Sequence, residues 1–163
     1  MSIPSSPRAK LLSTMELDFA RIPKDGSRMR ERAFWRFAGR IEHEQLEFKR
    51  SPAFLREAIP AMAMSRGGVL VIGVTDERRL VGRALDQETL DRVASAAYEA
   101  GVDVDLRAIT VGGTPITLVV VPAVRDRIVT TSDGRLLRRV GSANQPLRGD
   151  ALTRFVLARA LAR

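Results

Sequence analysis

Of the 19 acidic residues in this strongly basic chain, those at two places lie at the ends of adjacent predicted elements and could do chemistry. The first is the segment Glu42–Lys49, which contains Glu42, Glu47 and the single histidine, His43; the second is Asp76, just after an apolar run. Converging carboxylates bind hard divalent cations such as Mg²⁺ and Mn²⁺, and isolated carboxylates neutralise nearby arginines. A histidine beside them could serve as a general base, although a solvated loop histidine is the simpler interpretation. The contrast between these local acidic residues and the positive net charge of the whole chain is the main clue to function.

Two strands and an intervening helix are expected to position these acids. Leu46–Lys49 alternates between apolar and charged residues, which predicts a strand. Val69–Val74 is apolar almost throughout, which predicts a strand buried on both faces. Between them, Ala53–Met64 predicts a helix with Phe54 among its buried residues and a kink at Pro60.

The period of a strand decides how the acids can meet. Glu42 and Glu47 are separated by an odd number of positions, so on one straight strand they would face opposite sides. The chain must therefore turn between them, with Glu42 on the preceding loop or helix end. Lys49 shares a face with Glu47 and is expected either to pair with it or to contact phosphate. Gly67 and Gly68 are expected to form the tight turn before the second strand.

The remaining pattern predicts an α/β (α+β) fold, in which helices cover a mixed sheet with two hairpins. Residues 1–10 are expected to form a disordered basic tail and residues 11–163 a single domain, with N-terminal helices over 11–41 and the core over 42–163. The further elements expected are helices over Leu11–Phe19, Arg28–Arg40, Gln87–Ala100 and after Asp150, and hairpins over Val102–Val121 and Ile128–Val140.

Composition excludes several classes of protein. The chain has 163 residues and no cysteine, so disulfides and cysteine-ligated zinc are excluded. No apolar run approaches the roughly 18 residues that span a membrane, so we expect a cytoplasmic protein with no membrane partner. There is no Gly-x4-Gly-Lys-Ser/Thr loop, so ATP is not expected as a cofactor.

The net charge of +8 gives a long-range attraction for polyanions, and almost all of the positive charge is arginine. Arginine matches phosphate with a planar fork, which suits nucleic acid. On the predicted helix Arg28–Arg40, capped by Ser27, one stripe is basic and a parallel one is apolar. The basic stripe is either a phosphate-binding row or a solvated face: Arg28, Arg32, Arg36 and Arg40. Aromatic residues make up only 5% of the chain, which argues against a single-strand binder built on stacking; Trp35 and Tyr98 are expected to be packing residues.

Three separated blocks together resemble the Schlafen core domain, which is also described as an Alba-like DNA-binding domain. The first is the acidic segment Glu42–Lys49. The second, Ala61–Asp76, is similar to the family's Ala-Phe-Ala-Asn-Thr-x-Gly-Gly loop followed by Ile-Gly-Val-x-Asp, with Met64 where the family usually has Asn. The third, Leu137–Asn144, resembles its Arg-Val-Gly-Ser-x-Asn signature. Order and spacing agree from about Arg40 to Leu161.

The resemblance implies a site. Some members of the family are metal-dependent endoribonucleases acting on transfer or ribosomal RNA, and others bind nucleic acid only. The nuclease members use three carboxylates, which match Glu42, Glu47 and Asp76 here and would hold Mg²⁺ or Mn²⁺. Independently of the resemblance, three residues of the third block lie on and after the last predicted strand, where the arginine pair could grip backbone phosphates or else pair with the carboxylates: Arg138, Arg139 and Asn144. The eukaryotic domain has two lobes, and a homodimer of this chain would restore such a two-sided cleft.

Three functional hypotheses follow. The first is a nucleic-acid-binding protein that contacts transfer-RNA-like RNA or duplex DNA through arginines and Lys49. The second is a metal-dependent endoribonuclease that cleaves structured RNA with Glu42, Glu47 and Asp76. The third is a regulator whose acidic cluster contacts another protein.

Overall fold

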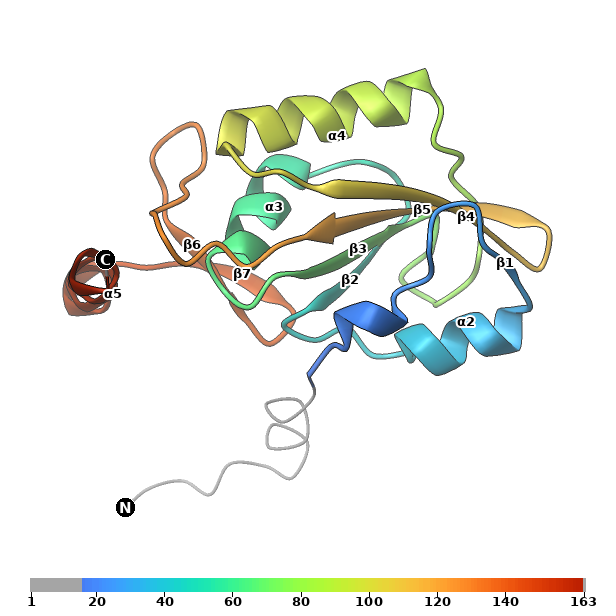
Figure 1. Ribbon diagram of the computed structural model, residues 1–163, viewed down its shortest axis with the longest axis horizontal. Helices are drawn as coiled ribbons and strands as arrows, with labels where there is room; N and C mark the ends of the chain where they lie inside the picture. Colours follow the sequence, from blue (N-terminus) through green and yellow to red (C-terminus); the bar gives the residue numbers. More distant parts are fainter. Residues whose placement is uncertain (1–15, 163) are drawn as a thin grey trace, which may run out of the picture.

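A five-stranded mixed sheet forms the centre of the computed structural model, which describes residues 16–162 (Figure 1). Its strands, in spatial order, are β1 (Arg28–Met29), β4 (Asp105–Val111), β5 (Thr114–Val121), β3 (Gly68–Ile72) and β2 (Leu46–Lys49). Strands β4 and β5 form the expected antiparallel hairpin, and β5 pairs antiparallel with β3. Strands β2 and β3 are parallel, with Lys49 opposite Ile72. Their carboxyl ends therefore meet at one edge of the sheet.

Helices cover both faces of this sheet. Helices α3 (Leu55–Ala63) and α4 (Gln87–Ala100) lie on one face, and α2 (Glu31–Ala38) lies on the other (Figure 1). Each face has its own apolar core, one centred on α3 and α4 and the other on the aromatic residues of α2. Strand β3 is buried along its whole length because it serves both cores, as its unbroken apolar sequence predicts. The α+β fold expected from the sequence is confirmed.

A smaller unit follows at the C-terminal end. Strands β6 (Leu137–Val140) and β7 (Ala143–Pro146) form a separate antiparallel pair, followed by α5 (Gly149–Leu161). The prediction that residues 128–131 pair with residues 135–140 is wrong. The turn at Gly134 closes only a short loop, in which the Thr131 N–H donates to the Arg135 carbonyl at 2.9 Å. The hairpin turn lies instead at Gly141, whose φ of +60° suits a tight connection.

The N-terminal helix prediction also needs correction. Helix α2 begins at Glu31 rather than Arg28, and Ser27 is not its cap. Arg28–Met29 extends instead beside β4, where the Thr110 N–H donates to the Ser27 carbonyl at 2.9 Å. The helix therefore buries a different face from the one expected: Phe34, Trp35 and Ala38. A 3-10 turn, η1 (Phe19–Arg21), precedes β1; the predicted tail 1–10 and most of the predicted helix Leu11–Phe19 lie outside the described residues.

Two aromatic residues expected in the core are exposed. Phe54, which directly precedes α3, has a left-handed backbone (φ 57°) and is 79% exposed. Tyr98 on α4 is 88% exposed, whereas Trp35 is buried as expected. No helix within residues 16–162 combines the length and apolar character needed to cross a bilayer.

Candidate functional site

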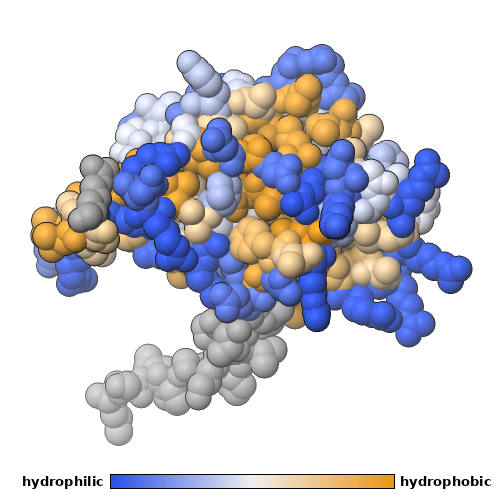
Figure 2. Space-filling view, in the orientation of Figure 1, coloured by the Kyte–Doolittle hydropathy of each residue, from blue (hydrophilic) through white to orange (hydrophobic). Residues whose placement is uncertain are grey.

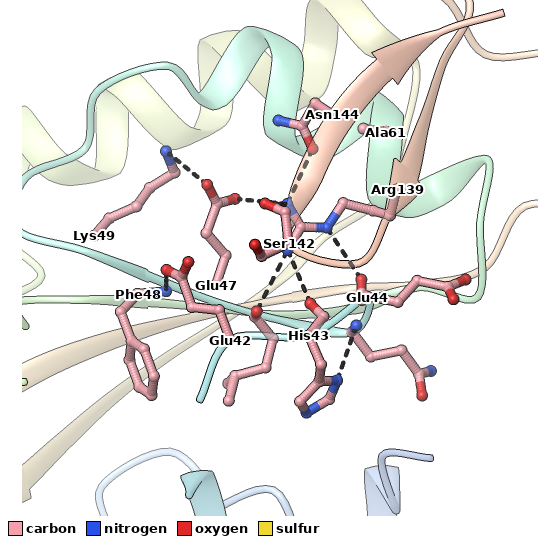
Figure 3. A network of polar contacts seen from close by, with 12 residues as sticks. Glu42, His43, Glu44, Glu47, Phe48, Lys49, Ala61, Arg139, Ser142 and Asn144 are labelled. Atoms are coloured by element: carbon pink, nitrogen blue, oxygen red, sulfur yellow. Dashed lines mark hydrogen bonds and ion pairs between the residues drawn. The ribbon is translucent and has the colours of Figure 1, made fainter. Parts of the chain in front are cut away.

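The side chain of Arg139 lies at the centre of a buried polar network (Figure 3). Its guanidinium donates to the carbonyls of His43 (2.9 Å), Glu44 (3.1 Å) and Ser142 (3.0 Å) and to Oδ1 of Asn144 (3.0 Å). Burial lowers the pKa of Arg139, and the neighbouring glutamates oppose this effect. Arg139 therefore connects the β6–β7 hairpin to the loop that precedes β2.

Glu47 is the acid in ion-pair contact with this guanidinium. Its Oε2 lies 3.8 Å from Nη1 of Arg139, and its Oε1 lies 3.7 Å from Nζ of Lys49. The side chains of Glu47 and Lys49 are only 17% and 10% exposed. Oε2 of Glu47 is buried and has no hydrogen-bond partner among the described residues. The pairing of Lys49 with Glu47, one of the two expected alternatives, is confirmed.

Glu42 lies in the loop before β2, as the odd spacing to Glu47 requires. Its Oε1 accepts a hydrogen bond from the Phe48 N–H at 2.9 Å, so the carboxylate folds back over the strand (Figure 3). Both acids help to stabilise the positive charge of Arg139. The loop therefore brings Glu42 and Glu47 to the same buried cation.

Asp76 is exposed in the turn that follows β3. Arg78, with a left-handed backbone (φ 63°), donates to the Asp76 carbonyl at 3.2 Å and to the Arg40 carbonyl at 3.0 Å. The Arg78 guanidinium also lies 4.7 Å from the centre of the Phe48 ring. These contacts attach the Asp76 turn to β2 and to the segment before it.

These contacts do not assemble a ready-made metal site. Within residues 16–162, no three His, Asp or Glu side chains are grouped so that they could hold an ion. Glu47 is engaged by two cations, and Glu42 by a backbone N–H. Direct coordination by Glu42, Glu47 and Asp76 would require these contacts to rearrange, and the Mg²⁺ or Mn²⁺ site stays a prediction.

His43 is buried rather than solvated, so the simpler of the two interpretations is wrong. Its Nδ1 accepts a hydrogen bond from the Gln45 N–H at 3.2 Å, which requires the unprotonated nitrogen. Burial, and then the positive charges of Arg139 and Arg66, lower its pKa below the usual 6.5. A neutral imidazole is therefore part of the fixed loop before β2.

The predicted phosphate-binding residues fall into two groups. Exposed arginines lie on β1, on α2 and directly after it: Arg28, Arg32, Arg36 and Arg40. Figure 2 shows hydrophilic side chains projecting from the surface in the region of α2. Arg40 lies 4.5 Å from the centre of the Trp35 ring, which holds its guanidinium beside α2. The second group faces inward, because Lys49, Arg139 and Asn144 are engaged in the buried network. Arg138 lies between these extremes, half-buried against the Phe155 ring at 5.0 Å.

The prediction that Arg139 and Asn144 grip phosphate is therefore not supported by their position; in the folded chain they bind to each other and to the loop before β2. Arg139 and Asn144 thus stabilise the fold, and a phosphate contact by the third block stays a prediction. Sequence reasoning also missed Arg30, an exposed arginine directly before α2, although it lies inside the same basic segment.

Two buried polar residues of this region were also missed by sequence reasoning. Gln45 accepts from the Leu17 N–H at 2.8 Å and donates to the Arg66 carbonyl at 3.0 Å. Ser65 accepts from the Arg139 N–H at 2.8 Å. Their only signal in the sequence was their place between recognised blocks. Gln45 thus connects the loop before β2 to the loop before β3, and Ser65 connects the latter loop to β6.

The glycine pair before β3 has a packing role. A Cβ on Gly68 would lie 2.5 Å from the Gln45 carbonyl oxygen, and one on Gly67 would lie 2.6 Å from the Val121 carbonyl oxygen. Gly67 also has a φ of +70°. The tight turn expected here is confirmed, and its close neighbours are backbone atoms of the protein.

Comparison with known proteins gives a family match over the segment that contains these loops. The family model described as Schlafen, AlbA_2 matches residues 42–148, which include both acidic segments and the β6–β7 hairpin. No curated protein matches the chain. Among solved structures, the crystal structure of the DIP2311 protein from Corynebacterium diphtheriae is similar, with 21% identity and a TM-score of 0.54. The match covers 64% of this chain and only 22% of that one. At this low sequence identity, the similarity shows a shared fold alone.

Proposed function

Because the chain belongs to the Schlafen AlbA_2 family, we propose that it binds nucleic acid through the exposed arginines of the segment that runs from β1 to just after α2. We call this set the arginine row: Arg28, Arg30, Arg32, Arg36 and Arg40. Nucleic acid is the polyanion that a basic protein of this family is suited to bind.

One observation carries the proposal. Every side chain of the arginine row is exposed, and none forms an ion pair with a carboxylate of residues 16–162. Two other exposed arginines, Arg127 and Arg135, pair instead with aspartates of their own loops at 3.3 and 2.9 Å. The arginine row can therefore bind phosphate without first breaking ion pairs within the protein.

The geometry of α2 suits a backbone contact. Arg32 and Arg36 are four residues apart on one helix, so they lie on the same face one turn apart. Such contacts recognise phosphate rather than bases, so binding should depend strongly on salt and weakly on sequence.

The experiment compares two double variants that lose the same charge. Arg32→Gln/Arg36→Gln removes unpaired arginines, and Arg127→Gln/Arg135→Gln removes paired ones. Affinity for fluorescent RNA and DNA, single-stranded and duplex, is measured by anisotropy at low salt. We expect the first variant to bind about tenfold more weakly than wild type, and the second to bind nearly as wild type does. Equal affinities for the two variants, or no binding by wild type, would refute the proposal.

The finer predictions stay predictions. They are a preference for transfer-RNA-like RNA or duplex DNA, cleavage with Mg²⁺ or Mn²⁺, a homodimer, and a cytoplasmic location. The protein-regulator hypothesis gains support only if neither RNA nor DNA is retained at low salt.

A further inference from the structure

Phe54 combines two features that the fold itself does not need. Its backbone is left-handed (φ 57°, ψ 27°), a conformation that large side chains rarely adopt. Its ring is 79% exposed, so the residue gains little from burial. Strained residues of this kind cluster at ligand sites, where the surrounding structure holds them in place.

The ring stands at a groove between α3 and α4. The groove has a volume of about 530 Å³, and its lining includes Pro52, Phe54, Arg56, Arg92 and Ser95. This volume suits a nucleotide, since ligand pockets in proteins span roughly 300 to 1,000 Å³. The lining thus offers an aromatic face together with cationic and hydroxyl groups, and its one carboxylate, Glu57, is paired with Arg135 at 3.7 Å.

The two arginines of the groove are available to an anion. Arg56 pairs with Glu99 and Arg92 with Glu88, both at 3.2 Å. The arginine side chains are 63% and 55% exposed, and ion pairs in such positions are weak. Among the described residues each of these arginines has this one polar partner, whereas Arg127 also donates to the Gly101 carbonyl and Arg135 also pairs with Glu57. A phosphate with its full charge therefore competes well for the guanidinium groups of Arg56 and Arg92.

The ring also adjoins the buried network. Nζ of Lys49 lies 5.9 Å from the centre of the Phe54 ring while pairing with Glu47. Phe54 therefore lies between the groove and the acidic segment, and a strand bound at the ring would pass close to Glu47.

We propose that Phe54 stacks an unpaired base of a single-stranded nucleic acid, with the adjoining backbone phosphates at Arg56 and Arg92. This inference rests on the proposed function and adds a preference for unpaired bases to it. A base within a duplex has both faces covered by its neighbours, so only a single strand or a loop can use the ring. The site complements the arginine row, which recognises the backbone of any strand.

The test separates stacking from folding. Phe54→Gly removes the ring and suits the left-handed backbone, so its thermal unfolding temperature should not fall below that of wild type. Phe54→Trp keeps an aromatic face. Tyr98→Ala is the matched control, because Tyr98 is equally exposed but lies outside the groove.

Each protein is titrated with a single-stranded RNA that carries one 2-aminopurine, and with the same sequence as a duplex. We expect Phe54→Gly to bind the single strand at least about fivefold more weakly and to lose the fluorescence change of the stacked base. Its duplex affinity, the affinity of Tyr98→Ala and that of Phe54→Trp should stay near wild type.

The failures are distinguishable. Wild-type affinity of Phe54→Gly for the single strand, or an equal loss for single strand and duplex, would overturn the stacking site while leaving the arginine row intact. Absence of binding by wild type to either nucleic acid would overturn both proposals.

Discussion

Nη1 of Arg139 lies 3.8 Å from Oε2 of Glu47, and this contact joins the β6–β7 hairpin to β2 from the interior of the protein. The Arg139 side chain has no exposed surface, and its other donors are taken by backbone carbonyls and Asn144. A buried cation of this kind depends on every one of its partners. Arg139 therefore fixes the geometry of the loop that carries Glu42 and Glu47.

Replacing Arg139 should lower the free energy of unfolding. Arg139→Met leaves Glu47 without its buried partner and several carbonyls without a donor, so we expect a loss of roughly 3–5 kcal/mol in the free energy of unfolding. Urea denaturation measures this loss. Arg138→Met is the control, because its half-buried side chain stacks on Phe155 outside the network, and it should cost less than about 1 kcal/mol. Equal losses for the two variants would contradict the central place of Arg139.

Stability should fall in mild acid because of His43. Its pKa is lowered in the folded state, first by burial and then by Arg139 and Arg66, while Glu44 acts in the opposite direction. As the pH falls below 6.5, the unfolded chain therefore takes up a proton at His43 more readily than the folded chain does. The free energy of unfolding falls as a result.

The matched variant is His43→Asn, whose Oδ1 can accept the Gln45 N–H without titrating. Unfolding free energies at about pH 7.5 and about pH 5 should differ more for wild type than for this variant. An identical pH dependence for both proteins would show that His43 does not titrate in this range.

The metal-dependent nuclease hypothesis predicts cleavage of transfer RNA by wild type with Mn²⁺ or Mg²⁺. Asp76→Asn should abolish cleavage while leaving the fold and the RNA affinity unchanged, because Asp76 is exposed and lies outside the arginine row. Cleavage is followed on denaturing gels, with a chelator as the control. Intact RNA from wild type in both metals would contradict this hypothesis and leave the binding proposal untouched.

Local signals predicted the elements whose ends are marked in the sequence. Helix α4 was predicted with its bounds because Asp86 caps it, accepting from the Thr89 N–H at 2.8 Å, and Gly101 ends it. Strand β3 was predicted because its apolar run is unbroken. Arg28–Met29 was missed as a strand because its pairing with residues 110–111 is distant in sequence, whereas its local pattern favours a helix.

The site was predictable in its residues but not in their orientations. The loop position of Glu42 followed from the strand period alone. The inward position of Arg139 could not be predicted in this way. The sequence of a two-stranded hairpin does not by itself show which of its two faces packs against the rest of the protein. Phe54 escaped prediction for a similar reason: its left-handed backbone turns the ring away from the helix face that its spacing suggested.

The salt dependence of binding tests the arginine row most directly. For duplex DNA, each phosphate contact contributes about 0.9 to the slope of log affinity against log salt concentration. The Arg32→Gln/Arg36→Gln variant should therefore bind with a slope about 1.8 units shallower than wild type. The Arg127→Gln/Arg135→Gln variant, with the same net charge, should keep the wild-type slope. A slope that falls equally in both variants, or in neither, would contradict the assignment of phosphate binding to the arginine row.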